Sequence, residues 1–296
     1  MAERVTADVL ALVPEAGQHL IRLDGATYLK RNGTLSRLPG DGSLDGLLAL
    51  SVDELRQFLD QDRPAAVLRP GAVIEAPIQG QEVWAAGVTY QRSLEARTDE
   101  AVSSDPYDRV YAAKRPELFF KATAGRVRGP GQAVFIRSDS SWDVPEPELA
   151  VICNRTLEVV GYTIGNDVSS RSIEGENPLY LPQAKVFDGC CALGPAVAMA
   201  WDYSPADRKI ELEIERNGEV VFRSETSTSA MRRSIPELVG YLGLNQRFDV
   251  GCILLTGTGI VPPTDFSLED GDEVTIRIDG IGVLKNPIRR HAPAVS

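Results

Sequence analysis

Residues 146–167 read EPELAVICNRTLEVVGYTIGND, and this stretch decides the fold. Its two runs of apolar and β-branched residues, 148–153 and 159–164, are typical of antiparallel strands joined by a polar turn. The pattern predicts a β-hairpin with its turn centred between Thr156 and Leu157. Similar runs recur at 133–137, 210–215 and 274–278. We therefore expect mostly antiparallel β-structure.

The hairpin carries three carboxylates that would meet on one face. Glu146 and Glu148 are two residues apart, and in an extended strand such side chains project to the same side. Counting back from the turn sets Asp167 opposite Glu146, where the Cβ atoms of an antiparallel pair lie about 5 Å apart. A single bulge would change this register. Pro145 and Pro147 exclude helix here and are typical of a strand entry or edge.

This carboxylate group has two interpretations. Glu146 and Glu148 are either solvated strand residues or, together with Asp167, ligands of a metal ion. Three crowded carboxylates repel one another unless a hard divalent cation lies between them. The candidate set contains no Cys or His, and an all-oxygen set favours Mg²⁺, with Mn²⁺ as the alternative, over Zn²⁺.

Two further segments are candidates for chemistry. Lys185 lies in the apolar, Pro- and Gly-punctuated segment 181–189, where it is either a surface lysine or a buried proton-transfer group. Residues 254–260, LLTGTGI, either offer backbone N–H groups to a carboxylate or form a plain tight turn. They follow no predicted βαβ unit, so a nucleotide-binding loop is not expected.

Composition excludes several classes of protein. The chain has 296 residues, of which 43% are hydrophobic and 25% charged, as is ordinary for a soluble globule. Its net charge of -11 argues against nucleic-acid binding, which needs clustered Lys and Arg. No apolar run is long enough for a membrane helix, and the N-terminus lacks a signal-peptide pattern, so we expect a cytoplasmic protein. The four cysteines lack CxxC spacing and are expected to be buried thiols.

The chain divides into two regions by pattern. Residues 1–75 contain Gly-rich turns and a predicted helix at 51–60, where Ser51 and Glu54 form a capping box. Residues 76–296 are richer in β-runs. We expect a small N-terminal cap domain over 1–75 and a catalytic domain over 76–296. Further helices are predicted at 90–101 and 234–242.

Taken in order, the motifs over about residues 80–290 resemble the fumarylacetoacetate hydrolase superfamily. They are Glu146-Pro147-Glu148, the segment GYTIGNDVS at 161–169, Lys185 before Phe187-Asp188, and Gly257-Thr258. The resemblance implies an α+β, β-rich fold, with a mixed β-roll catalytic domain and a small N-terminal cap, usually in a homodimer. It also implies Mg²⁺ on Glu146, Glu148 and Asp167, with Lys185 at the substrate.

The chain departs from the hydrolytic members of that superfamily at two positions. Those members carry a histidine three residues after the Tyr of a Gly-x-x-Tyr segment, and here Ser93 takes this place after Tyr90. Glu174 stands where the pattern Val-Ser-x-Arg-x-x-Gln has Gln. With these departures the sequence resembles the branch of 2-keto-3-deoxy-D-arabinonate dehydratases. That branch removes water from a 2-keto-3-deoxy sugar acid to give 2,5-dioxopentanoate in pentose oxidation.

The resemblance implies a Mg²⁺-dependent lyase that acts on a small 2-keto acid. Lys185 would move the C3 proton of the substrate. Glu117, whose family counterpart lies at the active site, would protonate the departing C4 hydroxyl. Further substrate contacts are expected from Tyr90, Arg92, Ser93, Arg171 and Thr258. The alternatives are hydrolysis or decarboxylation of an acylpyruvate or β-diketo acid, and a metal-stabilised protein without catalysis.

Overall fold

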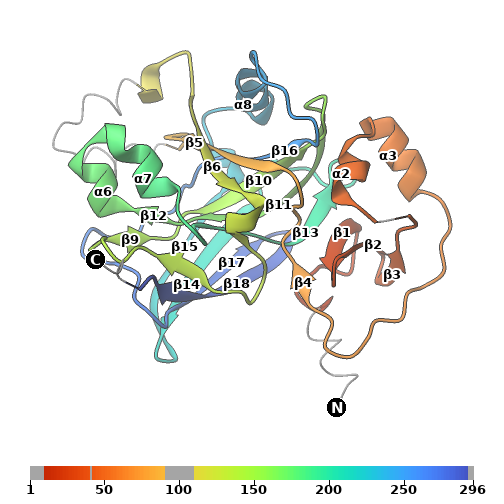
Figure 1. Ribbon diagram of the computed structural model, residues 1–296, viewed down its shortest axis with the longest axis horizontal. Coiled ribbons are helices and arrows are strands. Elements are labelled where there is room, and N and C mark those ends of the chain that lie inside the picture. The colour runs from red at the N-terminus through yellow and green to blue at the C-terminus, as the bar shows by residue number, and fades with distance from the viewer. Residues whose placement is uncertain (1–9, 41, 91–109, 293–296) are drawn as a thin grey trace.

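The computed structural model describes residues 10–40, 42–90 and 110–292. One large sheet contains β1 (Gln18–Leu23), β2 (Ala26–Arg31), β3 (Thr34–Arg37), β4 (Ile74–Glu75), β5 (Glu82–Gly87), β6 (Glu117–Thr123), β7 (Val127–Arg128), β10 (Pro147–Cys153), β11 (Val159–Asp167), β13 (Cys191–Met199) and β16 (Cys252–Leu255). Its order is β3-β2-β1-β13-β11-β10-β16-β5-β6, with β4 on β1 and β7 on β13. Figure 1 shows this sheet running through the whole molecule.

A second sheet covers the large one. It contains β8 (Val134–Ile136), β14 (Lys209–Arg216), β15 (Glu219–Ser227), β17 (Glu273–Ile278) and β18 (Gly282–Arg290). Its order is β15-β14-β17-β18-β8, and β14, β17 and β18 pack against β10, β11 and β13. Every residue of β10 and β13 is buried, because these central strands carry apolar residues on both faces.

A short two-stranded sheet and a few helices complete the fold. The two strands are β9 (Asp143–Val144) and β12 (Ser169–Ser170). The helices are α2 (Leu44–Leu48), α3 (Val52–Leu59), α6 (Arg171–Glu176), α7 (Leu181–Lys185) and α8 (Ile235–Leu242), with 3₁₀ turns η1 (Ala124–Arg126), η2 (Pro178–Tyr180) and η3 (Thr228–Ala230). Most strand pairs are antiparallel, as predicted, while β5–β16, β7–β13 and β8–β18 are parallel.

The predicted helices are found where the structure describes them. The helix at 51–60 is α3, and its capping box is confirmed, since the Ser51 side chain accepts from Glu54 N while the Glu54 carboxylate accepts from Ser51 N. The helix at 234–242 is α8, which begins after the N-cap Ser234. The helix predicted at 90–101 lies outside the described residues, apart from Tyr90.

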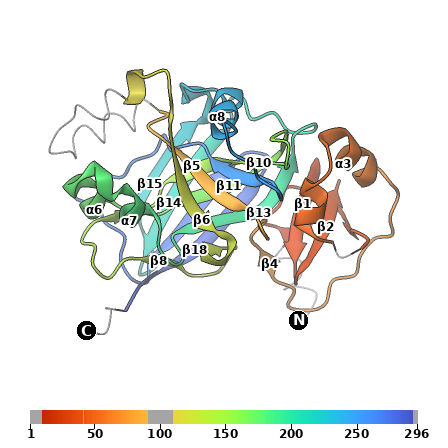
Figure 2. The same cartoon turned by 45° about the horizontal axis from the view of Figure 1, so that its top comes forward.

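Residues 18–37 extend the large sheet at one end. β1 joins β13 through only two residue pairs, His19 with Ala198 and Leu20 with Val197. Figures 1 and 2 show β1 to β3, α2 and α3 at the end of the molecule opposite α6 and α7. The domain boundary at residue 75 stays a prediction.

The predicted register of the hairpin is confirmed, for a reason that the sequence did not reveal. The turn is centred on Thr156, because Asn154 N donates to Glu158 O. A register shift then leaves Val160 unpaired between the pairs Cys153–Val159 and Ile152–Gly161. The turn centre lies half a residue before the predicted one, and the extra residue in β11 moves the centre of all later pairs forward by half a residue. Glu148 therefore faces Gly165, as the prediction of a turn centred between Thr156 and Leu157 requires.

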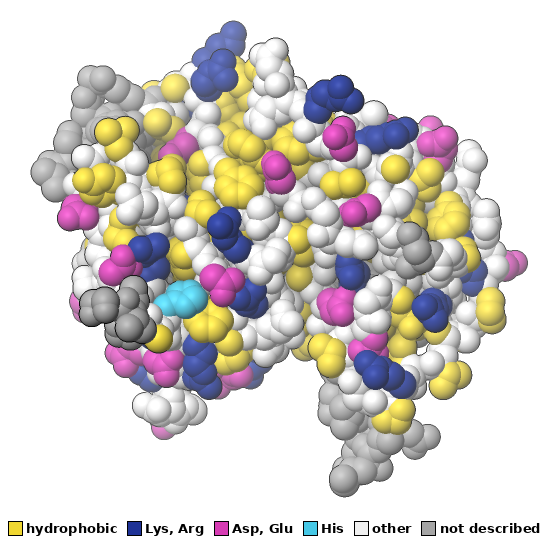
Figure 3. All heavy atoms as spheres, in the orientation of Figure 1, with side chains coloured by type: hydrophobic (Ala, Val, Ile, Leu, Met, Phe, Trp, Pro, Cys, Tyr) yellow, Lys and Arg dark blue, Asp and Glu magenta, His cyan; other side chains and the backbone are white. Residues whose placement is uncertain are grey.

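Other sequence expectations also have an outcome. All four cysteines are buried free thiols. No helix among the described residues is long and apolar enough to cross a membrane. On the face in Figure 3, Lys and Arg side chains are interspersed with Asp and Glu, and the described residues form no continuous basic patch there.

Candidate metal centre and active site

Three carboxylates converge where β10 and β11 enter the core. Glu146 precedes β10, Glu148 lies within it, and Asp167 ends β11. One oxygen of each lies within 4.8 Å of one oxygen of the others, and all three side chains are buried. Asp167 N donates to Glu146 O at 3.0 Å, so the hairpin itself fixes the spacing of the group. The alternative of solvated strand glutamates is excluded.

Two buried cationic side chains, Lys185 and Arg171, donate hydrogen bonds to carboxylate oxygens of Glu146 and Asp167. The Lys185 ammonium, at the end of α7, donates to Glu146 Oε2 at 2.7 Å and to Asp167 Oδ2 at 3.1 Å. Arg171 Nη2 donates to Glu146 Oε1 at 2.8 Å. Ser169 Oγ is the third acceptor of Lys185, at 2.6 Å. The surface alternative for Lys185 is therefore wrong, because its side chain is fully enclosed.

Glu148 has the most perturbed environment of the three. Its pKa is raised well above the ordinary value, chiefly by burial and then by the charges of Asp167 and Glu146, while Lys185 opposes the rise. The Gly257 N–H also stabilises the carboxylate, donating to Oε2 at 2.6 Å. Gly257 has φ +89°, a conformation that favours glycine. The glycine-rich loop thus offers its N–H to a carboxylate of the protein itself.

A cavity opens onto this group. Its charged lining consists of Glu117, Glu146, Asp167, Arg171, Glu174 and Lys185. Phe119 and Leu181 form apolar walls, and the Lys185 ammonium lies 5.5 Å from the centre of the Phe119 ring. The Glu117 side chain has room in the cavity because it faces Gly87 across the β5–β6 pair. A Cβ atom at position 87 would overlap with Glu117 Oε2. The predicted acid Glu117 therefore lies in one cavity with the predicted base Lys185.

The predicted substrate contacts have different outcomes. Thr258 and Arg171 line the cavity. Tyr90 is buried next to the glycine-rich loop, where its ring would contact a Cβ atom at Gly259, and it is not one of the lining residues. Arg92 and Ser93 lie outside the described residues. Substrate contact by any of the five stays a prediction.

The comparison with known families agrees with these motifs. The model of the family described as "Fumarylacetoacetate (FAA) hydrolase C-terminal" matches residues 82–289, which is well over half of the chain. The chain belongs to the fumarylacetoacetate hydrolase family. The family resemblance stated from the sequence is confirmed, and with it the α+β, β-rich fold.

Several members of the family are similar over most of their length. A Haloferax volcanii protein named "Probable 2-keto-3-deoxyxylonate dehydratase" is 50% identical over 243 residues, covering 80% of this chain and 83% of that protein. The 2-dehydro-3-deoxy-D-arabinonate dehydratase of Saccharolobus solfataricus is 45% identical over 222 residues, covering 73% and 74%. The solved structure of 2-keto-3-deoxy-D-arabinonate dehydratase complexed with magnesium and 2,5-dioxopentanoate superposes with TM-score 0.78 at 35% identity, covering 93% of this chain and 99% of that one.

The residues present fit the divalent ion that the family implies. The group provides carboxylate oxygens only, which is the set that Mg²⁺ prefers. Burial and then the charges of Asp167 and Glu146 raise the pKa of Glu148, and a cation among the three side chains would relieve the charge repulsion. Glu146, Glu148 and Asp167 are therefore the residues that would hold the ion.

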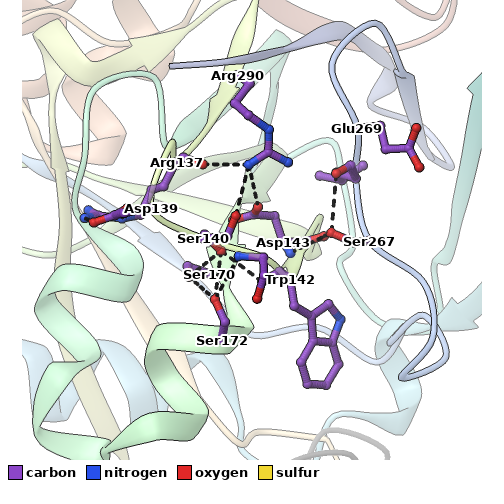
Figure 4. A network of polar contacts seen from close by, with 12 residues as sticks. Arg137, Asp139, Ser140, Trp142, Asp143, Ser170, Ser172, Ser267, Glu269 and Arg290 are labelled. Carbon is purple, nitrogen blue, oxygen red and sulfur yellow. Dashed lines mark hydrogen bonds and ion pairs between the residues drawn. The ribbon is translucent and has the colours of Figure 1, made fainter. Parts of the chain in front are cut away.

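Contacts outside the cavity fix the segment that precedes Glu146 and connect it to α6. β9 pairs with β12, and the first residue of α6, Arg171, donates its N–H to Trp142 O at 2.7 Å. Figure 4 shows the Arg290 guanidinium pointing at the carbonyl oxygens of Arg137 and Ser140, at 2.8 and 3.0 Å. The C-terminal strand β18 thus ties down the segment that leads into Glu146.

Two residues of the site were not singled out as functional from the sequence. Glu174 lines the cavity from α6, and the replacement of Gln at this position was the available signal. Lys121 lies behind the cavity, in ion-pair contact with Asp167 Oδ1 at 2.5 Å. Strand alternation from Glu117 and Phe119 would put Lys121 on the cavity face, but the register shift between Phe120 and Ala122 breaks that alternation, so the sequence carried no signal for its actual position.

Proposed function

We propose that this chain is a Mg²⁺-dependent dehydratase of a 2-keto-3-deoxy sugar acid, converting 2-keto-3-deoxy-D-arabinonate to 2,5-dioxopentanoate and water. The observation that carries the proposal is the buried group of Glu146, Glu148 and Asp167, two of which line one cavity together with Lys185. Relatives with 45 to 50% identity bear dehydratase names, which supports the reaction class. The similar solved structure is complexed with magnesium, which supports the choice of ion.

The histidines of the chain support dehydration over hydrolysis. The sequence contains two, and neither lines the cavity. His19 Nε2 contacts Gly280 O at 2.9 Å, and His291 Nε2 contacts Asp188 O at 2.8 Å. The histidine that activates water in the hydrolytic members therefore has no equivalent here. Elimination of the substrate's own hydroxyl needs no activated water.

The proposed reaction assigns one proton transfer to each of two side chains. Bound Mg²⁺ would supply a Lewis acid that increases the acidity of the C3 protons next to the 2-keto group. In its unprotonated amine form, Lys185 takes a C3 proton, and the electron pair of that bond forms the C3=C4 double bond as the C4–O bond breaks. Glu117 protonates the departing hydroxyl, so that water leaves. Transfer of a proton from C5 to C3 then gives the C4=C5 enol, and transfer of the C5 hydroxyl proton to C4 gives the C5 aldehyde.

The carboxylate and hydroxyl groups of such a substrate suit the charges of the cavity. Arg171 offers a guanidinium at its wall, Thr258 a hydroxyl, and Glu174 a second carboxyl group for a sugar hydroxyl. Tyr90, Arg92 and Ser93 complete the proposed substrate contacts. Phe119 and Leu181 limit the width of the cavity, as a short carbon chain requires.

Product analysis tests this function. The protein is incubated with 2-keto-3-deoxy-D-arabinonate and, separately, with a simple acylpyruvate, each with Mg²⁺ and with EDTA, and the products are identified by NMR and mass spectrometry. We expect Mg²⁺-dependent loss of one water from the sugar acid and an unchanged acylpyruvate. Cleavage of the acylpyruvate without dehydration of the sugar acid would contradict the proposal and favour the hydrolase alternative.

The wider setting of the enzyme is also proposed. We infer a cytoplasmic homodimer that works in pentose catabolism, with residues 1–75 as a cap domain and 76–296 as the catalytic domain. The family resemblance supports the dimer, and the β1–β13 connection by two residue pairs supports a cap that folds beside the main body. Native mass spectrometry tests the dimer, since a single-chain mass at micromolar concentration would contradict it.

A further inference from the structure

Lys121 occupies an exceptional position in β6. Ala122 pairs with Val83 and Phe120 with Trp84, so the register shifts and Lys121 has no partner residue across the β5–β6 pair. Such a bulge redirects a side chain. The side chain of Lys121 is 0% exposed and lies on the inner side of the strand, behind the cavity rather than in its wall.

The Lys121 ammonium joins three parts of the site. It donates to Lys185 O at 2.6 Å and to Val168 O at 2.9 Å, and it pairs with Asp167 Oδ1 at 2.5 Å. Two of its three donors are thus used by carbonyl groups, and the Asp167 contact is an ion pair without ordinary hydrogen-bond geometry. The ion pair with Asp167 offsets part of the cost of burying the ammonium.

Two of these three acceptors belong to residues with a proposed role in the site, Lys185 and Asp167. Lys185 ends α7, a helix of five residues, and the carbonyl groups at a helix end lack donors within the helix. Lys121 supplies a donor to that carbonyl, while its ion pair orients the carboxylate of Asp167. One buried charge thus connects a proposed metal ligand to the backbone of the proposed base.

We propose that Lys121 is a positioning residue that holds Asp167 and Lys185 in their places relative to each other. The proposal rests on the proposed function in so far as these two residues act on metal and substrate. Lys121 itself touches neither, because it lies behind the cavity wall.

The direction in which Mg²⁺ affinity changes when Lys121 is replaced distinguishes a positioning role from a purely electrostatic effect of its charge. A positive charge beside Asp167 repels a divalent cation, so its removal would tighten Mg²⁺ binding if charge were the whole effect. Loss of a residue that orients a ligand instead weakens binding, typically by about 10- to 100-fold. Positioning therefore predicts weaker binding in a variant without the charge.

The test compares two buried lysines. Lys121→Met is measured beside Lys30→Met, since Lys30 is equally buried, donates to Val13 O and Leu10 O, and pairs with Glu15, all outside the site. Mg²⁺ affinity is measured by calorimetry without substrate. Amide exchange of Val186, whose N–H donates to Pro182 O in α7, is measured without metal.

We expect Lys121→Met to bind Mg²⁺ about 10- to 100-fold more weakly, to exchange the Val186 amide faster, and to lose kcat with little change in KM. Lys30→Met should match the wild type in all three, even if it is less stable. Unchanged or tighter Mg²⁺ binding together with unchanged Val186 exchange in Lys121→Met would overturn the proposal.

Two further outcomes are decided by the same data. If Lys121→Met fails to fold, Lys121→Gln replaces it, because Gln keeps donors for the carbonyl groups and removes the charge; the same weakening is expected, and its absence overturns the proposal. If the wild type binds no Mg²⁺, the proposed function fails, and faster Val186 exchange in the variant still supports the positioning of Lys185.

Discussion

Asp143 and Glu146 are buried carboxylates only three residues apart, and their surroundings differ. Each oxygen of Glu146 has a cationic nitrogen within hydrogen-bond distance, from Arg171 at 2.8 Å and from Lys185 at 2.7 Å. The nearest cation of Asp143 is Arg290, with Nη1 at 3.7 Å from Oδ2 (Figure 4). Within the described part of the chain, no hydrogen bond of ordinary geometry reaches either oxygen of Asp143.

The difference separates a carboxylate organised for chemistry from one that is merely enclosed. Burial raises the pKa of Asp143 to about 6, although Ser140, Arg290 and Arg137 oppose the rise. Around Glu146, by contrast, the fold provides cations that orient the carboxylate before any ligand arrives. Substitutions in the metal-centre group should therefore change catalysis, and substitution of Asp143 should change stability.

The largest effect is expected from removing a proposed metal ligand. Asp167→Asn should lower Mg²⁺ affinity and reduce turnover by about a thousandfold, because a bound metal contributes several kcal/mol to catalysis and about 1.4 kcal/mol is tenfold in rate. Steady-state kinetics and calorimetry measure both. Asp188→Asn, an exposed partner of Arg128, is the matched control and should behave as the wild type. Full activity of Asp167→Asn at low Mg²⁺ would contradict the assignment.

Loss of the proposed base should come second. Lys185→Met should reduce kcat by about a hundredfold, as is usual for loss of a proton-transfer group, while Mg²⁺ still binds. Product formation at saturating Mg²⁺ measures the effect, and Lys209→Met, an exposed lysine in β14, serves as the control. Normal turnover of Lys185→Met with metal bound would remove Lys185 from the mechanism.

A smaller effect is expected from moving the proposed acid. Gly87→Ala places a Cβ atom where it overlaps with Glu117 Oε2, so the carboxylate must shift. We expect kcat to fall about tenfold with unchanged Mg²⁺ affinity, since misplacement of a catalytic group is costly even at small distances. Gly125→Ala meets no atom within 4 Å and is the control. Equal kcat in the two variants would argue against Glu117 as the acid.

The smallest effect on turnover is expected at Asp143, where stability should change instead. The folded pKa of about 6 lies above the ordinary 3.8, so the folded state holds its proton more tightly. The resulting stabilisation is fully present below about pH 3.8 and is lost as the pH rises through about 6, a loss of up to about 3 kcal/mol. Asp143→Asn should therefore be less pH-dependent in its free energy of unfolding, with normal kcat.

Urea unfolding of both proteins at pH 5 and pH 7.5 measures this difference. Relative to wild type, the free energy of unfolding of Asp143→Asn should be higher at pH 7.5 than it is at pH 5. The same gap at both values would show that Asp143 does not titrate in this range. A large loss of kcat would show that the support of Glu146 depends on the charge of Asp143.

The sequence predicted the hairpin and the convergence of its carboxylates, because period-2 alternation and turn counting carry that information. The count succeeded only because the bulge at Val160 compensates for a turn centred on Thr156. Lys121 was missed since its bulge has no sequence signature of its own. The helices α6 and α7, of six and five residues, are too short to show a helical period.

Arg171 shows another limit of sequence reasoning. Its type suggested a substrate carboxylate as partner, and the structure gives it Glu146 as a partner within the protein. A residue type identifies the chemistry of a partner, but only the position of the α6 N-terminus beside Glu146 decides which carboxylate is in reach.

The most direct test of the metal-dependent dehydration is a Mg²⁺ titration of the metal-free protein with 2-keto-3-deoxy-D-arabinonate as substrate. Formation of 2,5-dioxopentanoate is followed by NMR against the amount of Mg²⁺ bound per chain. We expect no product without metal and a rate that rises until one Mg²⁺ is bound per chain. Product formation at the full rate in the presence of EDTA would contradict the central role given to Glu146, Glu148 and Asp167.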